Sequence, residues 1–438
     1  MCGSHQMVAK MSGQKQEQKE QKTQRNAGAR PRPKQIVGMD AHTRKLAISI
    51  WEWSDDPWNP TFVGQVKCFG IDQLKEVYEK HVDLDSITIV EASMNSAMIK
   101  ETLDEVGFRA EVVRADIIAD KERKRKVCDI KDAENIAKAY MKGDVKDFVW
   151  TATGKFAKYR AIFCAYRDAR KEMLRNWNRI WSLCCACGIR LPEETGREFL
   201  ELVRGTLKGF TIDEITAERF EMGLADYEKY LERSEKLDGM ILEIVRSEDD
   251  MIDLMQLPGF YYMSAFAAKT IVEDAERFSK GSKLSAYSGL APQVNTSGEE
   301  EVRAEKKGGS GKPLDTEGRR DLKYYYCEAA QTVLNTCGKT TLGKWGWHLI
   351  FKGKERNKVV CGVARKLTVY SWHIMRGDPT PNREGEDLFK RKMIRFATDI
   401  GKKRLRELGY KSRSEFADRH VQRLYGTLPK ESEDKAKN

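Results

Sequence analysis

The sequence predicts an α/β domain followed by a predominantly α-helical remainder, and three observations support this fold class. Short runs rich in β-branched and aromatic residues are concentrated between residues 35 and 113. Apolar residues recur at intervals of three and four after residue 155, which is typical of amphipathic helices. The chain has 438 residues, enough for about three domains at roughly 150 residues each.

The α/β part contains five predicted strands: residues 35–40, 45–53, 62–69, 87–91 and 110–113. The first three lie close enough in the sequence for hairpin connections. Residues 74–81 and 98–106 show helical spacing before the fourth and fifth strands. The order β-β-β-α-β-α-β-α is typical of a mixed sheet with helices on its faces, and we assign it to a domain spanning residues 35–150.

The remainder divides into three predicted helical parts. Residues 155–187 and 222–245 carry apolar stripes, and together they predict a long antiparallel coiled-coil hairpin within residues 151–250. Residues 251–376 are expected to form a second, mostly helical domain. Residues 377–438 are expected to form a basic helical tail.

The charge balance indicates a polyanionic partner. Lys and Arg number 78 against 67 Asp and Glu, a net charge of +11. Residues 1–34 hold eight basic and two acidic side chains, so we expect a disordered basic arm. A second basic run, from Lys390 through Lys392 to Arg406, predicts contact with nucleic-acid phosphates. No apolar run approaches the roughly 18 residues of a membrane span, so no membrane association is expected.

Four carboxylates follow the predicted strands. Asp40 ends the first strand and Glu91 ends the fourth, so their side chains emerge at one sheet edge if the two strands are neighbours. Asp129 and Asp132 begin a predicted helix, and their spacing places both on one face. Carboxylates gathered in one cleft repel each other unless a cation neutralises them, so the pattern predicts a Mg²⁺ site suited to phosphodiester chemistry.

This arrangement resembles a known family. Asp40, Glu91, Asp129 and Asp132 on such a frame look like the RuvC-type, ribonuclease-H-like domain of the DEDD insertion-sequence transposases. These form the insertion sequence one-ten family, which includes the Piv inversion recombinase and the RNA-guided bridge recombinases. Further motifs resemble that family's second transposase domain: Leu257-Pro258-Gly259, Gly289-Leu290-Ala291-Pro292, Ser297-Gly298 and Gly318-Arg319-Arg320-Asp321-Leu322.

The resemblance implies a DNA transposase or recombinase of a mobile element. Ser297 is then the nucleophile that forms a phosphoserine bond with DNA, and the four acidic residues hold Mg²⁺ or Mn²⁺. Basic residues near the serine are expected to clamp DNA phosphates: Arg303, Lys306, Lys307, Arg319 and Arg320.

The resemblance also implies the partners. They are donor and target DNA, a structured noncoding guide RNA, known in the family as a bridge RNA, and further copies of the chain in a homodimer or homotetramer. The expected location is the cytoplasm of a prokaryote, in association with the nucleoid.

Three alternatives stay open at this point. Ser310, in a glycine-rich stretch, competes with Ser297 as the nucleophile. A RuvC-like metal-dependent nuclease would hydrolyse branched DNA with the acidic residues alone. A non-catalytic nucleic-acid-binding protein would use neither site.

Overall fold

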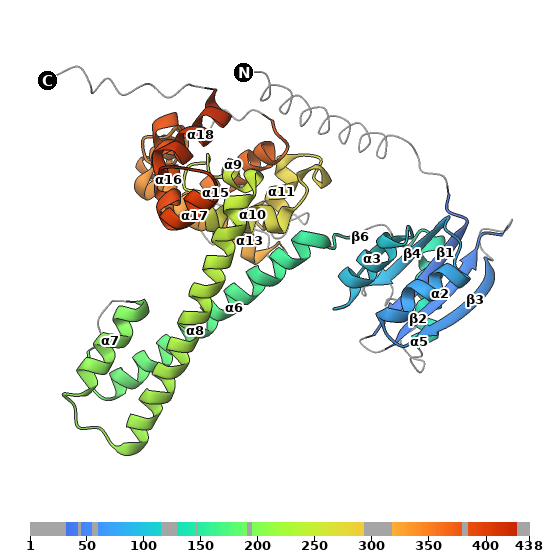
Figure 1. Cartoon of the computed structure of the whole chain (residues 1–438), viewed down its shortest axis with the longest axis horizontal. Coiled ribbons are helices and arrows are strands. Elements are labelled where there is room, and N and C mark those ends of the chain that lie inside the picture. Colours follow the sequence, from blue (N-terminus) through green and yellow to red (C-terminus); the bar gives the residue numbers. More distant parts are fainter. Residues whose placement is uncertain are drawn as a thin grey trace, which may run out of the picture. The chain divides into compact units, whose positions relative to one another are not determined.

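The computed structural model describes residues 32–42, 45–54, 60–114, 129–145, 148–190, 195–292, 318–378 and 384–426. The chain divides into two compact units, Met1–Gly154 and Lys155–Asn438 (Figure 1). The first is a mixed α/β unit with a six-stranded sheet, and the second is built from helices. The predicted fold class is therefore confirmed at the level of a mixed sheet followed by a mostly helical part.

The sheet of the first unit has the order β3-β2-β1-β4-β5-β6. Its strands are β1 (Gln35–Ala41), β2 (Leu46–Glu52), β3 (Thr61–Cys68), β4 (Ser86–Glu91), β5 (Arg109–Val113) and β6 (Phe148–Val149). The pairs β1–β2, β2–β3 and β5–β6 are antiparallel, whereas β1–β4 and β4–β5 are parallel. The five predicted strands are present; β6 was missed because two residues carry no periodic signal.

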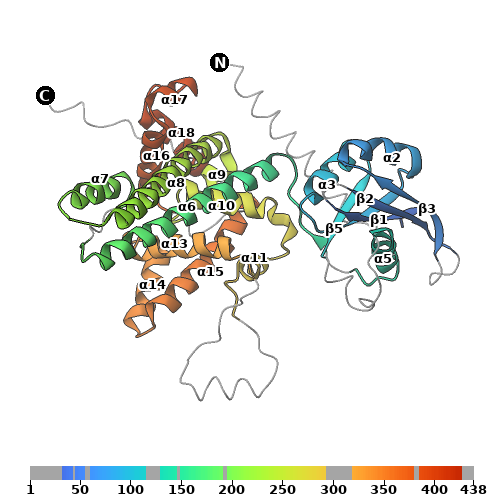
Figure 2. The same cartoon turned by 90° about the horizontal axis from the view of Figure 1, so that it is seen from below.

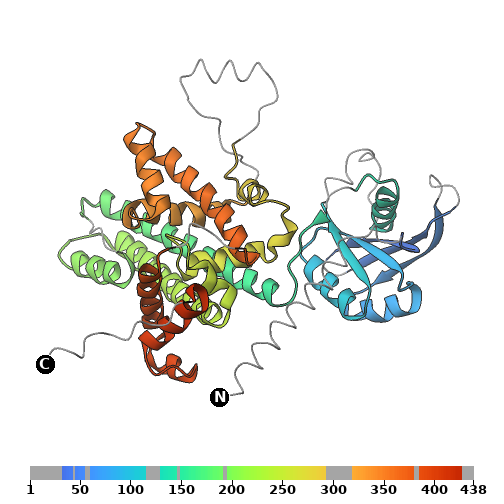
Figure 3. The ribbon, with the colours of Figure 1, turned by 90° about the horizontal axis from the view of Figure 1, so that it is seen from above.

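Helices cover both faces of this sheet (Figures 2 and 3). They are α2 (Leu74–His81), which follows a 3₁₀ turn at Ile71–Gln73, α3 (Ser96–Glu105) and α5 (Asp129–Met141). Val37 and Met39 pack in the cluster that contains residues of α2 and α3, whereas Ile36 packs in the cluster that contains residues of α5. Because side chains alternate along a strand, Gly38 and Asp40 share the face of Ile36 and are directed toward α5.

The second unit begins with a long helical hairpin. Its helices are α6 (Gly154–Ala186), α7 (Gly196–Leu207) and α8 (Glu214–Ser247). The start of α6 lies at the end of α8, where the Lys155 ammonium is 2.8 Å from the Glu248 carboxylate, so the two run antiparallel. The predicted bounds differ from those observed. The second long helix begins at Glu214, where the Asp213 side chain caps it, and α7 lies between the two predicted helices.

The other helices of this unit share one apolar core, which also takes in Phe163 of α6 and Ile241 of α8. They are α9 (Asp249–Leu254), α10 (Tyr262–Val272), α11 (Gly281–Tyr287), α13 (Arg320–Thr336), α14 (Thr341–Phe351), α15 (Arg356–Met375), α16 (Glu386–Ile400), α17 (Lys402–Glu407) and α18 (Arg413–Tyr425), with a 3₁₀ turn at Ala275–Arg277. Across the described ranges, none of the helices combines the length and the apolar character needed to cross a membrane.

The last three helices are packed parts of this core. Phe389, Phe396 and Phe416 are each exposed by 1% or less. The Lys392 ammonium is buried 2.8 Å from the Glu384 carboxylate and donates to the backbone carbonyl of Met255 at 2.7 Å. The prediction that Lys392 contacts nucleic acid was therefore wrong, because its charge is used inside the fold.

Candidate functional site

Two of the predicted acidic residues stand side by side at the end of neighbouring strands. The strands β1 and β4 are parallel, with Gly38 opposite Ile89 and Met39 opposite Val90. One step further along the same register, Asp40 lies beside Glu91. Residues in register on adjacent strands point to the same face, so both carboxylates are directed to the side covered by α5.

A close approach of backbones brings the helix to this edge. A Cβ atom placed on Gly38 would lie 2.0 Å from the carbonyl oxygen of Ala133 and 2.7 Å from the backbone nitrogen of Ala137. Only glycine on β1, opposite small residues on α5, permits such contact. This contact holds the first turn of α5, with Asp129 and Asp132, close to Asp40.

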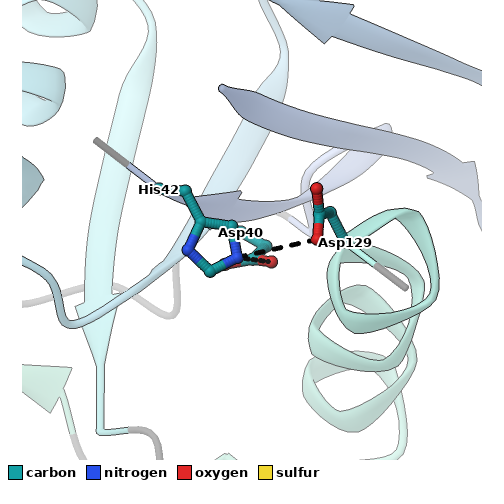
Figure 4. Close-up of side chains that lie close together, drawn as sticks. All are labelled: Asp40, His42 and Asp129. Atoms are coloured by element: carbon teal, nitrogen blue, oxygen red, sulfur yellow. Dashed lines mark ion pairs between the residues drawn. The ribbon is translucent and has the colours of Figure 1, made fainter. Parts of the chain in front are cut away.

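A histidine completes the cluster. The His42 Nε2 atom is 3.1 Å from Asp40 Oδ2 and 3.8 Å from Asp129 Oδ1 (Figure 4). One ligand atom from each of these three residues lies within 4.8 Å of the others. The sequence analysis did not include His42. Its position two residues after Asp40 is the signal that was available, because residues at i and i+2 share a strand face.

The pKa values of Asp40 and Glu91 are shifted by burial and by their neighbours in the cluster. Burial raises the pKa of Asp40, His42 opposes that change, and the charges of Asp132 and Asp129 add to it. Burial also raises the pKa of Glu91, and the charges of Asp40 and Asp132 add to it. The side chain of Asp40 is 7% exposed, so it is poorly hydrated. Mutually repelling carboxylates with one imidazole form a donor set that fits a divalent cation, which would relieve the repulsion.

Most residues predicted near the nucleophile lie outside the described part of the chain. These are Ser297, Arg303, Lys306, Lys307 and the alternative nucleophile Ser310. Described residues on either side of residues 293–317 are in contact with each other. The backbone N–H of Arg319 donates to the carbonyl of Tyr287 at 2.8 Å, and a Cβ atom on Gly318 would lie 2.1 Å from the backbone nitrogen of Gly289.

The two remaining basic residues differ in their surroundings. The Arg319 guanidinium donates to Asp321 through Nε at 3.1 Å and through Nη2 at 2.8 Å. Arg167 of α6 donates to the same carboxylate at 3.1 Å. Although burial raises the pKa of Asp321, the hydrogen bond and charge of Arg319 bring it below its usual value. Arg319 is thus paired within the fold although its side chain is 43% exposed, and Arg320 is exposed as well.

Comparison with known proteins adds one finding. Residues 253–342 match the family described as Transposase IS116/IS110/IS902 family. No curated protein sequence matches the chain. The matched range contains Ser297, the five predicted basic residues and the contact between Gly289 and Gly318. The match covers residues 253–342 of the 438, so it shows that this segment is similar to the IS116/IS110/IS902 transposase family.

Proposed function

We propose that this protein is a DNA recombinase that cuts and rejoins DNA through a phosphoserine intermediate. One observation carries the proposal: Asp40, His42 and Asp129 each bring a ligand atom within 4.8 Å of the others, and Asp132 and Glu91 interact with Asp40 through their charges, in a chain whose residues 253–342 match a transposase family. A transposase must break and reform phosphodiester bonds, and an acidic cluster of this kind is suited to that chemistry.

We infer that the first unit is a ribonuclease-H-like domain of the RuvC type. Three antiparallel strands followed by parallel β4 and β5, in the order β3-β2-β1-β4-β5, support this. The acidic residues come from the central strand β1, its neighbour β4 and a helix that crosses them. Rigid elements therefore hold each carboxylate, as a catalytic site requires.

Asp40, Glu91, Asp129 and Asp132, with His42, would hold Mg²⁺ or Mn²⁺. When bound, the cation supplies positive charge to a DNA phosphate and to the oxygens that react there. The carboxylates on β1 and β4 are fixed by the sheet, and those on α5 are fixed by the contact at Gly38. The protein thus sets the geometry before DNA arrives.

In the proposed reaction the Ser297 hydroxyl oxygen attacks a DNA phosphorus. A new ester bond forms between serine and phosphate, the bond from phosphorus to one strand end breaks, and the serine proton passes to the departing strand hydroxyl. The number of phosphodiester bonds is unchanged, so attack by another strand hydroxyl can reverse the step and join new DNA ends. Arg303, Lys306, Lys307, Arg319 and Arg320 follow Ser297 in the sequence and would neutralise the phosphates nearby.

We further propose that a bridge RNA guides the reaction and that the active form is a homodimer or homotetramer. The net charge of +11 supports an additional polyanion. Phosphate contacts do not read sequence, so base pairing by an RNA would supply the choice of target.

The experiment uses the full chain, a plasmid bearing the DNA that flanks the gene, and RNA transcribed from the adjacent noncoding sequence. Protein that stays on DNA after denaturation reports the covalent intermediate. We expect such adducts with the unmodified protein and none with Ser297→Ala or Asp40→Asn. Adducts that persist with Ser297→Ala would disprove the assignment of the nucleophile.

The same assay separates the alternative function. A RuvC-like nuclease would use the acidic cluster alone to hydrolyse branched DNA, and hydrolysis leaves no protein on the product. Cleavage of a four-way DNA junction that depends on Asp40 but not on Ser297, with no adducts, would favour the nuclease. A non-catalytic binding protein would give neither product.

A further inference from the structure

A pocket of about 500 Å³ lies between α6 and α13 in the second unit. The helices are held together there by the ion pair of Arg167 with Asp321 and by the contact of the Phe163 and Tyr325 rings, whose centroids are 5.5 Å apart. The volume is within the roughly 300–1,000 Å³ typical of sites for small molecules. None of the described residues that line this pocket belongs to the acidic cluster.

The pocket is rich in positive charge. Its lining includes Arg170, Lys171 and Arg320, all of them exposed. Within the described ranges, Arg170 and Arg320 form no ion pair. The carboxylate nearest to the Lys171 ammonium is that of Asp168 at 3.9 Å, and both side chains are more than half exposed. Exposed pairs of this kind are weak, so the charges stay available to a polyanion.

The same pocket presents aromatic rings. Tyr324 is 57% exposed, and its ring contacts that of Tyr325 edge-on, at 5.2 Å between centroids. Tyr166 lines the pocket from α6. Burial raises the pKa of Tyr166 and of Tyr324, so both hydroxyls stay protonated and can donate hydrogen bonds. An exposed aromatic ring that shares a pocket with Arg170, Lys171 and Arg320 suits a ligand that has both a flat face and a negative charge.

We propose that this pocket binds one unpaired nucleotide of a nucleic-acid strand. Its base stacks on Tyr324, and its phosphate lies against Arg170 and Arg320. The positive charges alone would attract any phosphate-containing ligand, but the exposed ring increases the affinity only for a ligand that has a base. In duplex DNA the base faces are covered by stacking, so an unstacked or single-stranded position is required.

The site is close in sequence to the segment of the proposed nucleophile. Arg320 follows Gly318 and Arg319, which are anchored on Gly289 and Tyr287. A strand held in the pocket would thus be held beside the point where that segment rejoins the described fold. This proposal rests on the proposed function, because it names the place where the recombinase would bind an unpaired strand. Binding at this place requires neither Ser297 nor a metal.

The test measures binding of the full chain to fluorescent oligonucleotides by anisotropy, with EDTA present. The probes are a 12-nucleotide thymidine strand, the same strand with every base replaced by an abasic unit, and a blunt duplex. We expect Tyr324→Ala to weaken binding of the thymidine strand about tenfold or more and to leave the abasic strand unaffected. Arg170→Ala should weaken both strands.

Four control proteins accompany these variants. Tyr324→Phe keeps the ring and should bind like the unmodified chain. Phe351→Ala removes an 83% exposed aromatic ring at the end of α14, and Arg233→Ala removes an exposed cation of α8. Neither variant should change the difference in affinity between the thymidine strand and the abasic strand. Ser297→Ala should bind normally, which separates failure of this inference from failure of the proposed reaction. If Tyr324→Ala lowers the melting temperature, Tyr324→Leu replaces it.

Three results would overturn the inference. One is equal loss on the thymidine and abasic strands with Tyr324→Ala, which would show that no base is stacked there. Another is an unchanged affinity for both strands in Tyr324→Ala and in Arg170→Ala. The third is binding of poly-glutamate that Tyr324→Ala weakens as much as it weakens binding of the thymidine strand, which would assign the pocket to an acidic protein segment.

Discussion

A methyl group added to Gly38 would stand 2.0 Å from the carbonyl oxygen of Ala133, so strand β1 and helix α5 touch through their backbones at this point. The contact lies two residues before Asp40 and one helical turn after Asp129. It links the two halves of the acidic cluster, and the first prediction follows from it.

Gly38→Ala should push α5 away from β1 and separate Asp129 from Asp40. We expect Mn²⁺ affinity, measured by titration calorimetry, to fall about tenfold or more, because ligand geometry is lost. Overpacking should also lower the free energy of unfolding by about 1–3 kcal/mol. Gly64→Ala on β3 is the matched control, since nothing lies within 4 Å of its added Cβ. Equal metal affinity in both variants would refute the role of this contact.

His42→Ala should distinguish one metal from another. Imidazole nitrogen is a better ligand for transition metals than for Mg²⁺, so we expect Mn²⁺ affinity to fall about tenfold and Mg²⁺ affinity to fall less. His81→Ala, at the exposed end of α2, serves as the control. Equal losses for the two cations would mean that His42 acts only through the position of Asp40.

The buried pair of Lys392 and Glu384 should be structural. Glu384→Ala leaves a buried ammonium whose neighbours are the carbonyls of Met255 and Leu257, and we expect the free energy of unfolding to fall by about 3–5 kcal/mol. Replacing both partners, with Lys392→Met and Glu384→Leu, should cost less than Glu384→Ala alone. Urea unfolding of the three proteins measures this. A double variant as unstable as the single one would show that the charge is not the cause.

His420 should make the second unit sensitive to acid. Burial, with the charge of Arg423 next, lowers its pKa from 6.5 to about 4, while Asp249 opposes the change and Arg419 adds to it. The unfolded chain therefore takes up a proton between pH 6.5 and 4 that the folded chain does not. Stability should be complete above pH 6.5, fall as the pH drops, and level off below pH 4, a change on the order of 3 kcal/mol.

His420→Gln should remove this part of the acid dependence, whereas His348→Gln on α14 should not. Unfolding by urea at pH 7, 5.5 and 4 tests the prediction. If His420→Gln and the unmodified chain lose the same free energy between pH 7 and 4, another group is responsible.

Most of the fold could be predicted from the sequence. The strand β1 is apolar and bounded by polar residues, and α6 has an apolar stripe more than thirty residues long, so both periodic patterns were strong. Helix α7 was missed because its twelve residues closely follow Pro192 in the sequence, and proline favours a break in a helical pattern. The first turns of α8 are rich in glutamate, which hid its true start at Glu214.

The acidic residues could be predicted, but their arrangement could not. Asp40 and Glu91 were placed at strand ends, and their proximity was conditional on the two strands being neighbours, which the sheet order shows them to be. The contact of Gly38 with Ala133 depends on three-dimensional packing and leaves no periodic signal. Lys392 was misread for a similar reason: a run of basic residues in sequence does not reveal which one points into a core. His42 was overlooked because its one signal in the sequence, its position two residues after Asp40, gains meaning only once Asp40 is known to lie in a cluster.

The most direct test of the central claim is to identify the residue that carries DNA after the reaction. Adducts are digested with nuclease and trypsin, and the remaining nucleotide is located by mass spectrometry. Trypsin places Ser297 in the peptide of residues 284–303 and Ser310 in that of residues 308–319, because the bond between Lys312 and Pro313 resists cleavage. We expect the nucleotide on Ser297, with Mg²⁺ or Mn²⁺ required and Asp40→Asn inactive. A nucleotide on Ser310, or cleaved DNA with none on the protein, would contradict it.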